Sequence, residues 1–233
     1  MRYLDCKTEI KLCDETPILR TESCSKEPET IQWIEEYVKP EDTFVDIGAN
    51  IGAYSFIAAQ YCSKVYAFEP AVSNFYLLLK NITLNNLRST IKPFPFPLGE
   101  YDGLTYFRYK DLEFGSTHDN LQGTILHPIQ QFRLDTLFHN GHIKEPTHIK
   151  CDVDGQELIV LNGMTNILKE YSPKSLQIEC SSHDRVVQQW LTTEYNYVIE
   201  KQTVRNNKDF SNVLFIRRDI SLAKEGWGIG DHA

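Results

Sequence analysis

A buried-strand pattern that runs directly into a glycine-containing loop limits most strongly what this chain can fold into. The stretch Thr43–Ile47 is short and mainly apolar, and Gly48 and Gly52 lie in the loop that follows it. Residues 54–61 are then apolar and helix-like. A buried strand, a tight turn and a helix in this order open a parallel α/β unit, in which ligands bind beyond the carboxyl ends of the strands. We therefore expect a ligand site at this loop.

The same alternation continues along the chain and predicts one mainly parallel sheet with helices on both faces. The further predicted strands are 64–69, 148–152 and 175–180, and the predicted helices are 29–38, 54–61, 71–85, 156–170 and 184–193. Two strands close together in sequence, 197–201 and 212–217, break the alternation at the end. We expect these two strands to form an antiparallel pair.

The segment from residue 91 to residue 139 follows a different pattern. The extended stretch 91–98 contains three prolines, which suit the edge of a sheet and not its centre. Residues 104–109 resemble an added strand after a turn, and 133–139 a short helix. Residues 110–130 show little periodicity, and we expect them to form a mobile loop over a site.

Length and charge restrict the class of protein. The chain has 233 residues, 41% of them hydrophobic, which is enough for one domain with a full core. We divide it into an N-terminal extension (1–28), a central domain (29–218) and a C-terminal tail (219–233). The formal net charge is −8, and an acidic surface repels phosphate backbones, so general nucleic-acid binding is not expected.

Cysteine usage and hydropathy favour a cytoplasmic protein. The six cysteines show no C-x-x-C spacing, and no histidine cluster has the spacing of zinc ligands. The first residues lack the apolar stretch of a signal peptide. No apolar run reaches the roughly 18 residues that a membrane span needs. We expect free thiols, no metal site and no membrane span.

The side chains around the glycine loop indicate which ligand it binds. Gly48 permits a tight turn through backbone angles closed to other residues, and Gly52 presents no side chain against a ligand on the loop. Asn50 offers both a donor and an acceptor. Asp46 cannot neutralise a pyrophosphate, but its carboxylate can accept hydrogen bonds from an ammonium group. The loop also lacks G-x-G-x-x-G, so we favour the amino-acid part of S-adenosylmethionine over a dinucleotide.

An acidic residue at the end of the second strand completes the cofactor pattern. Glu69 lies 21 residues after Gly48, where a carboxylate can bind the two hydroxyls of a ribose. We add Leu98, at the end of the proline-rich stretch, to the predicted cofactor contacts. The order of strand, Asp-x-Gly-x-Asn-x-Gly, helix, strand and terminal glutamate is far more specific than a glycine loop alone.

Several separate motifs then resemble those of one family, the FkbM-type methyltransferases. The similar stretches are 45–55, 66–70, 134–137, 149–157 and 160–163, followed by Pro173 and Glu179. They occur in the family's order and cover about residues 40–182. This chain departs from the family at Asp154, where a glutamate is usual. The shorter side chain changes the reach of that carboxylate and can alter the substrate class.

The resemblance implies a Rossmann-like methyltransferase sandwich, with a mainly parallel seven-stranded sheet and an antiparallel strand near the C-terminus. It also implies S-adenosylmethionine as cofactor and usually O-methylation of a hydroxyl. The acceptors of such enzymes are often sugars, glycans or polyketide-type natural products. We therefore expect a small-molecule or glycan acceptor, while the sequence leaves the oligomeric state open.

Methyl transfer needs an aligned acceptor and a group that takes its proton. Asp152 and Glu179 end neighbouring predicted strands, so their carboxylates are expected to face one pocket. They could act as a base, position substrate, hold magnesium or manganese, or serve a structural role. His183 follows closely and is a second candidate base, and Lys150 lies within the strand that leads to Asp152.

Two other functions stay open from the sequence. One is methylation of nitrogen, or of a protein or RNA target, although no Asn/Asp-Pro-Pro-Tyr/Phe motif is present. The other is a binding module that keeps the cofactor pocket without activity. The complete set of Asp46, Gly48, Asn50, Gly52 and Glu69 argues against a lost pocket.

Overall fold

The structure is a computed structural model, and it describes residues 1–109, 112–116, 125–181, 185–204 and 209–221. Its centre is a seven-stranded sheet in the order β10-β11-β9-β8-β3-β4-β5. In that order the strands are Tyr197–Val204, Phe210–Arg217, Ser175–Ser181, His148–Cys151, Thr43–Ile47, Lys64–Phe68 and Ile91–Phe94. All neighbours pair in parallel except β11, which is antiparallel to both β9 and β10. The expected mainly parallel sheet, with an antiparallel strand near the C-terminus, is confirmed.

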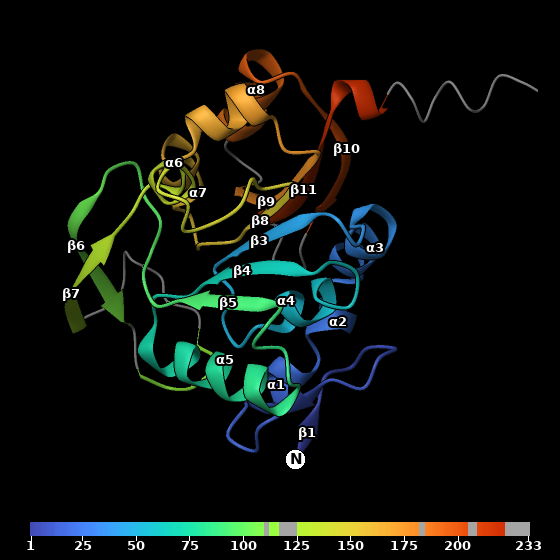
Figure 1. Cartoon of the computed structure of the whole chain (residues 1–233), viewed down its shortest axis with the longest axis vertical. Coiled ribbons are helices and arrows are strands. Elements are labelled where there is room, and N and C mark those ends of the chain that lie inside the picture. Colours follow the sequence, from blue (N-terminus) through green and yellow to red (C-terminus); the bar gives the residue numbers. More distant parts are fainter. Residues whose placement is uncertain (110–111, 117–124, 182–184, 205–208, 222–233) are drawn as a thin grey trace, which may run out of the picture.

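Helices cover both faces of this sheet (Figure 1). One face carries α3 (Pro28–Tyr37), α4 (Ala53–Ala58) and α5 (Val72–Leu84), and the other carries α6 (Leu134–His139), α7 (Glu157–Asn162) and α8 (Val186–Glu194). Successive residues of β3 therefore point into two separate cores, Phe44 into the first and Val45 into the second. No helix in the described part of the chain is long and apolar enough to cross a membrane.

The edge of the sheet lies where the prolines predict it. Pro93 belongs to β5, the last strand in the sheet order, which pairs with β4 alone. A proline has no backbone N–H to donate, so an edge strand tolerates it and a central strand does not.

The N-terminal extension packs against the α5 side of the sheet. It contains a small antiparallel hairpin, β1 (Arg2–Tyr3) with β2 (Lys11–Leu12), and two short helices, α1 (Ile18–Thr21) and α2 (Ser23–Lys26). Ile10 and Leu12 join the core beneath α5. Asn81 of α5 accepts a hydrogen bond from the backbone N–H of Cys13 at 2.9 Å. The extension thus shares the core, and the boundaries drawn at residues 28 and 218 stay a prediction.

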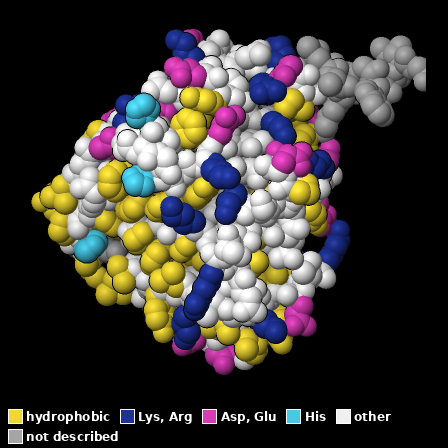
Figure 2. Space-filling view, viewed as in Figure 1, with side chains coloured by type: hydrophobic (Ala, Val, Ile, Leu, Met, Phe, Trp, Pro, Cys, Tyr) yellow, Lys and Arg dark blue, Asp and Glu magenta, His cyan; other side chains and the backbone are white. Residues whose placement is uncertain are grey.

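The prediction of a loop over residues 110–130 is wrong from residue 125 onward, where the chain forms a strand. Strand β7 (Ile125–Gln131) pairs antiparallel with β6 (Gly103–Tyr109) and forms a separate two-stranded arm. The pairing joins segments that are distant in sequence, and Pro128 interrupts the alternation that would reveal the strand. Hydrophobic side chains gather over this arm and over α5 in Figure 2. Two residues of β6, Leu104 and Tyr106, are both 64% exposed.

The predicted helix 156–170 is also divided into two parts. After α7 the chain turns at Gly163 and continues as a short π-helix, η1 (Ile167–Tyr171). A Cβ on Gly163 would lie 2.0 Å from the carbonyl oxygen of Gly99, so only glycine allows this close approach. Asp135 caps η1 by accepting hydrogen bonds from the backbone N–H of Asn166 and of Ile167, at 3.1 and 3.0 Å.

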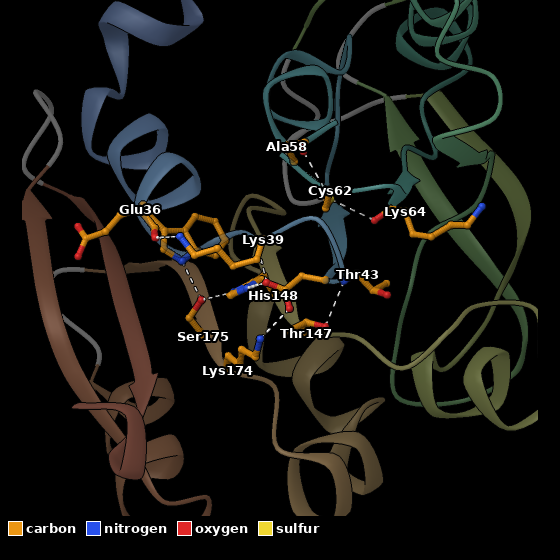
Figure 3. Close-up of polar contacts among 12 residues, drawn as sticks. Glu36, Lys39, Thr43, Ala58, Cys62, Lys64, Thr147, His148, Lys174 and Ser175 are labelled. Carbon is orange, nitrogen blue, oxygen red and sulfur yellow. Dashed lines mark hydrogen bonds and ion pairs between the residues drawn. The ribbon is translucent and has the colours of Figure 1, made fainter. Parts of the chain in front are cut away.

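The amino ends of β3, β8 and β9 meet in a buried polar network (Figure 3). The Nδ1 atom of His148 lies 2.7 Å from Ser175 Oγ, and its Nε2 atom lies 3.1 Å from Asp42 Oδ2. Trp33 Nε1 donates to the same serine oxygen at 2.8 Å, and Lys174 Nζ donates to Asp42 Oδ1 at 2.7 Å. The order Asp–His–Ser also occurs in nucleophilic sites, but Ser175 has no exposed surface. We therefore assign the network a structural role that joins three strands to α3.

Burial and hydrogen bonding fix the charges in this network. Burial lowers the pKa of His148 despite the neighbouring carboxylate, so the ring stays neutral. Burial alone would raise the pKa of Asp42, but hydrogen bonds from His148 and Lys174 hold it well below its usual range. Asp42 is thus an ionised residue whose charge is balanced by Lys174.

Removing the shared hydroxyl should destabilise the fold. We expect Ser175→Ala to lower the free energy of unfolding by about 1–3 kcal/mol, because the indole N–H of Trp33 and one nitrogen of His148 lose their partner. Urea denaturation followed by circular dichroism measures this change. Ser89→Ala, at an exposed position, is the control and should change stability by less than about 0.5 kcal/mol. Equal losses in both variants would contradict the assignment.

Candidate active site

A cavity of about 270 Å³ lies where the loops after β3, β4 and β8 meet, at the carboxyl edge of the sheet. This is the edge at which the glycine loop was expected to bind a ligand. Most residues of the two predicted sets line it, namely Gly48, Asn50, Glu69, Leu98 and Asp152. The β6–β7 arm and the N-terminal extension complete the wall with further residues, among them Tyr106, Phe107, Arg20 and Ser23.

Gly48 brings two of these loops into contact. Its φ is +83°, and a Cβ there would lie 1.9 Å from the backbone oxygen of Asp152. The N–H groups of Gly48 and Ala49 both donate to the carbonyl of Phe68 at 3.0 Å, which ties the loop to the end of β4. Glycine is therefore required here both by the backbone angle and by the space available.

Gly52 and Asp46 do not line the cavity, so their cofactor contacts stay a prediction. The reason for glycine at position 52 differs from the expected one, because a Cβ there would lie 2.5 Å from Leu78 Cδ1 and 2.8 Å from Phe56 Cζ. Gly52 thus lets α4 and α5 pack. Asp46 is fully buried and accepts a 2.6 Å hydrogen bond from Ser55, while its Oδ1 atom has no partner among the described residues.

Glu69 connects two loops and faces the cavity. Its carboxylate accepts hydrogen bonds from the N–H of Asn50 at 2.7 Å and of Ala71 at 2.8 Å. Burial raises the pKa of Glu69 to about 7, although both backbone donors act in the opposite direction. Each oxygen keeps a second lone pair for a ligand hydroxyl. The position thus fits the expected ribose contact.

A buried ion pair lies at the end of β8. Lys150 Nζ donates to Asp152 Oδ2 at 2.9 Å and lies 4.8 Å from the centre of the Tyr54 ring. Burial would lower the pKa of Lys150, but the neighbouring carboxylates of Asp152, Glu27 and Asp46 raise it above its ordinary value. The ammonium group therefore stays charged and holds one oxygen of Asp152 in place.

The carboxylates of Asp152 and Glu179 lie close together, as the strand pattern predicts. Glu179 is not among the residues that line the cavity, so its catalytic role stays a prediction. One oxygen each of Asp152, Asp154 and Glu179 lies within 4.8 Å of the others. Three carboxylates at this spacing can share a proton or hold a hard cation, so the geometry leaves both chemistries open. The second candidate base, His183, lies outside the described residues.

Glu157 has a structural task beside this cluster. Its Oε1 atom accepts hydrogen bonds from the N–H of Val153 at 3.1 Å and of Gly155 at 3.2 Å. Burial raises the pKa of Glu157 to about 7, although the hydrogen bonds from both backbone donors act in the opposite direction. Glu157 therefore shapes the loop that carries Asp154, whose φ is +51°.

The N-terminal extension supplies a part of the wall that sequence reasoning missed. Arg20, Ser23, Lys26 and Glu27 all line the cavity. The carbonyl of Ser23 accepts a 3.1 Å hydrogen bond from the hydroxyl of Tyr54, which attaches α2 to α4. Helices α1 and α2 have four residues each, too few for a hydrophobic period to reveal them.

Ser116 lines another side of the cavity, so residues 112–116 lie beside the site, in agreement with the expectation for this segment. Asn74 of α5 accepts from the N–H of Gly115 at 2.7 Å and donates to the carbonyl of Ser116 at 3.0 Å. Asn50 donates to that carbonyl at 3.2 Å. The side chain of Asn50 thus links the glycine loop to the segment that covers it. His118, in the same predicted loop, lies outside the described residues.

The sequence model of the family described as the methyltransferase FkbM domain matches residues 46–211. The hexuronic acid methyltransferase AglP of Haloferax volcanii is 27% identical over 194 residues, which are 83% of this chain and 79% of that protein.

Two solved structures share the fold. Methyltransferase FkbM from Methylobacillus flagellatus KT aligns with a TM-score of 0.54 at 20% identity, over 80% of this chain and 50% of that chain. TrmK of M. capricolum in complex with S-adenosyl-homocysteine aligns with a TM-score of 0.51 at 11% identity, over 81% and 67%. This chain therefore spans about half the length of the solved FkbM protein.

The residues present fit S-adenosylmethionine. Buried Glu69 offers acceptors for ribose hydroxyls, and Phe68, Leu98 and Val160 provide apolar wall. The acidic cluster of Asp152, Asp154 and Glu179 gives a negative environment suited to a ligand with a positive sulfur and an ammonium group. Cofactor and fold are thus as the resemblance implied, while individual contacts stay predictions.

A methyl group at position 48 should disrupt the site. We expect Gly48→Ala to lower the free energy of unfolding by on the order of 4 kcal/mol and to abolish cofactor binding, because its Cβ collides with the Asp152 backbone. Gly141→Ala is the matched control: its φ is +72° with no atom within 4 Å, so it should cost about 1–2 kcal/mol. Denaturation and calorimetry measure both effects. Equal losses would show that only the backbone angle matters.

Ionisation of Glu69 should control cofactor affinity. We expect Glu69→Ala to raise the Kd for S-adenosyl-homocysteine about 10- to 100-fold. Affinity of the unaltered protein should fall as pH drops through about 7, because protonation removes acceptor strength from a group whose pKa is raised to about 7. Calorimetric titrations between pH 5.5 and 8.5, with exposed Glu170→Ala as control, measure this. A variant with the same affinity and pH profile as the control would refute the ribose contact.

Proposed function

This chain belongs to the FkbM methyltransferase family, and we propose that it methylates an oxygen atom of a sugar or glycan. It is an S-adenosylmethionine-dependent methyltransferase, and the cofactor supplies a methyl group bound to a positively charged sulfur. The observation that carries the proposal is the cavity in which Glu69 and the Lys150–Asp152 pair face the same space. One side binds the cofactor, and the other can activate an acceptor hydroxyl.

The proposed acceptor class rests on likeness and on charge. A relative at 27% identity is named a hexuronic acid methyltransferase, which acts on an acidic sugar. The net charge of −8 disfavours a nucleic-acid acceptor. Two alternatives stay open. The first is methylation of nitrogen, or of a protein or RNA target, and the second is an inactive binding module. We also keep the cytoplasm as the proposed location, since the six cysteines, all within the described residues, form no disulfide.

Asp152 is the proposed proton acceptor. The acceptor oxygen forms a bond to the methyl carbon, the carbon–sulfur bond breaks, and the hydroxyl proton passes to the carboxylate of Asp152. Lys150 Nζ donates a charge-assisted hydrogen bond to Oδ2 of Asp152 and holds that oxygen in place. Glu179 and Asp154 lie close enough to share the proton or to hold a divalent cation with Asp152. That cation would lower the pKa of the acceptor hydroxyl instead.

A screen of glycosides tests the function. The protein is incubated with methyl-labelled S-adenosylmethionine and neutral or acidic methyl glycosides, with EDTA or with magnesium. Label in a product that resists mild alkali indicates a methyl ether, and label released by alkali indicates a methyl ester, which needs no base. Label in added peptide or RNA, with the sugars unlabelled, would favour methylation of a protein or RNA target. Cofactor binding without turnover of any acceptor would favour the inactive binding module.

Replacement of Asp152 should separate catalysis from binding. We expect Asp152→Asn to lower kcat about 10²- to 10⁴-fold, the range for loss of a general base, while the Kd of S-adenosyl-homocysteine changes less than about threefold. Asp219→Asn serves as the matched control, because Asp219 is also a carboxylate paired with a basic side chain, Arg217, and does not line the cavity. Unchanged kcat in Asp152→Asn would remove this residue from the reaction. Activity lost with EDTA and restored by magnesium would assign the cluster to a cation.

A further inference from the structure

Arg20 places a charged group in the cavity wall from outside the matched family domain. It belongs to α1, whereas the family match begins at residue 46. Its Nε atom donates to the carbonyl of Gly115 at 2.7 Å. Its two terminal nitrogens have no hydrogen-bond partner among the described residues, and the side chain is half-buried. Most of a guanidinium group's donors are therefore available to a ligand.

The stem of Arg20 is held in position. A Cβ on Gly115 would lie 2.9 Å from Arg20 Cγ and 3.0 Å from Pro17 Cγ, so this glycine packs directly against α1. Asn74 fixes Gly115 in turn, through the 2.7 Å hydrogen bond to its N–H. A guanidinium fixed through its Nε and its aliphatic part loses little freedom when a ligand binds to its far side.

Charge around the cavity makes Arg20 a suitable position for an anion. Two lysines, Lys26 and Lys150, also line the wall, and Lys150 is already paired with Asp152. The positive charge of Arg20 acts on Glu69 and lowers the pKa of that carboxyl against the effect of burial. Both oxygens of Glu69 accept backbone hydrogen bonds, and no hydrogen bond joins Glu69 to Arg20.

We propose that Arg20 binds a carboxylate of a ligand in this cavity. A planar guanidinium matches the two oxygens of a carboxylate, and its charge matches as well. Two ligands of this enzyme carry that group: the amino-acid part of S-adenosylmethionine and an acidic sugar acceptor. The second source rests on the proposed sugar acceptor, whereas the first needs only the cofactor.

Paired ligands that differ by the carboxylate test the proposal. S-Adenosyl-homocysteine is compared with 5′-methylthioadenosine, which lacks the amino-acid part. With S-adenosyl-homocysteine saturating, methyl glucuronide is compared with methyl glucoside. Calorimetry measures each Kd for the unaltered chain, Arg20→Gln, Arg20→Lys and the control Arg88→Gln, an exposed arginine that contacts Thr83. Thermal melting checks that each variant folds.

We expect Arg20→Gln to weaken one carboxylate ligand about tenfold or more and its carboxylate-free counterpart less than about threefold. Arg20→Lys should recover only part of the loss, because an ammonium cannot donate in the planar two-point geometry. The control should leave all affinities unchanged. A selective loss for S-adenosyl-homocysteine assigns Arg20 to the cofactor, and a selective loss for glucuronide assigns it to the acceptor.

Equal or absent losses within both pairs would overturn the proposal. If Arg20→Gln does not fold, Arg20→Lys serves as the test by itself. A ratio of Kd values within each ligand pair that equals the ratio of the unaltered chain would then overturn the proposal. The proposed sugar methylation can fail separately. In that case no glycoside is methylated or bound, while the arm with S-adenosyl-homocysteine still gives an answer about Arg20.

Discussion

The close approach of the Gly48 backbone to that of Asp152 is the constraint on which the site depends. It places the loop after β3 directly against the loop after β8, with no room for a side chain between them. The first loop carries the cofactor side of the cavity, and the second carries the Lys150–Asp152 pair. Because backbone touches backbone, the distance between binding and reacting groups is set by covalent geometry and sheet pairing. Flexible side chains do not determine it.

Much of the parallel core could be predicted from local sequence. The strands β3 and β4 are mainly apolar because helices cover both of their faces, and such a pattern can be recognised without knowledge of the neighbouring strands. The prolines of β5 correctly predict an edge, since proline cannot donate to a second neighbour. Glu69 and Asn50 were identified from their order along the chain, and both line the cavity.

Features that depend on distant contacts were not predictable. Strand β7 exists because β6 pairs with it, and its own residues alternate poorly. The break after α7 reflects a contact between Gly163 and Gly99, two residues that no local pattern connects. The same holds for Arg20, whose place in the cavity wall follows from the folding of two very short helices against α4. Sequence motifs therefore predicted the residues of the glycine loop and Glu69 in the cavity wall better than the segments that cover the cavity.

The strands β3, β8 and β9 carry polar clusters at both of their ends. At the carboxyl ends lie Asp152 and Glu179, and at the amino ends lie Asp42, His148 and Ser175, with mainly apolar side chains between. The proposed reaction site thus lies at one end of these strands, and the polar network that joins them to α3 lies at the other. Such an arrangement gives the fold evolvability: residues around the cavity can be exchanged for a new acceptor while the far end preserves the architecture that presents them.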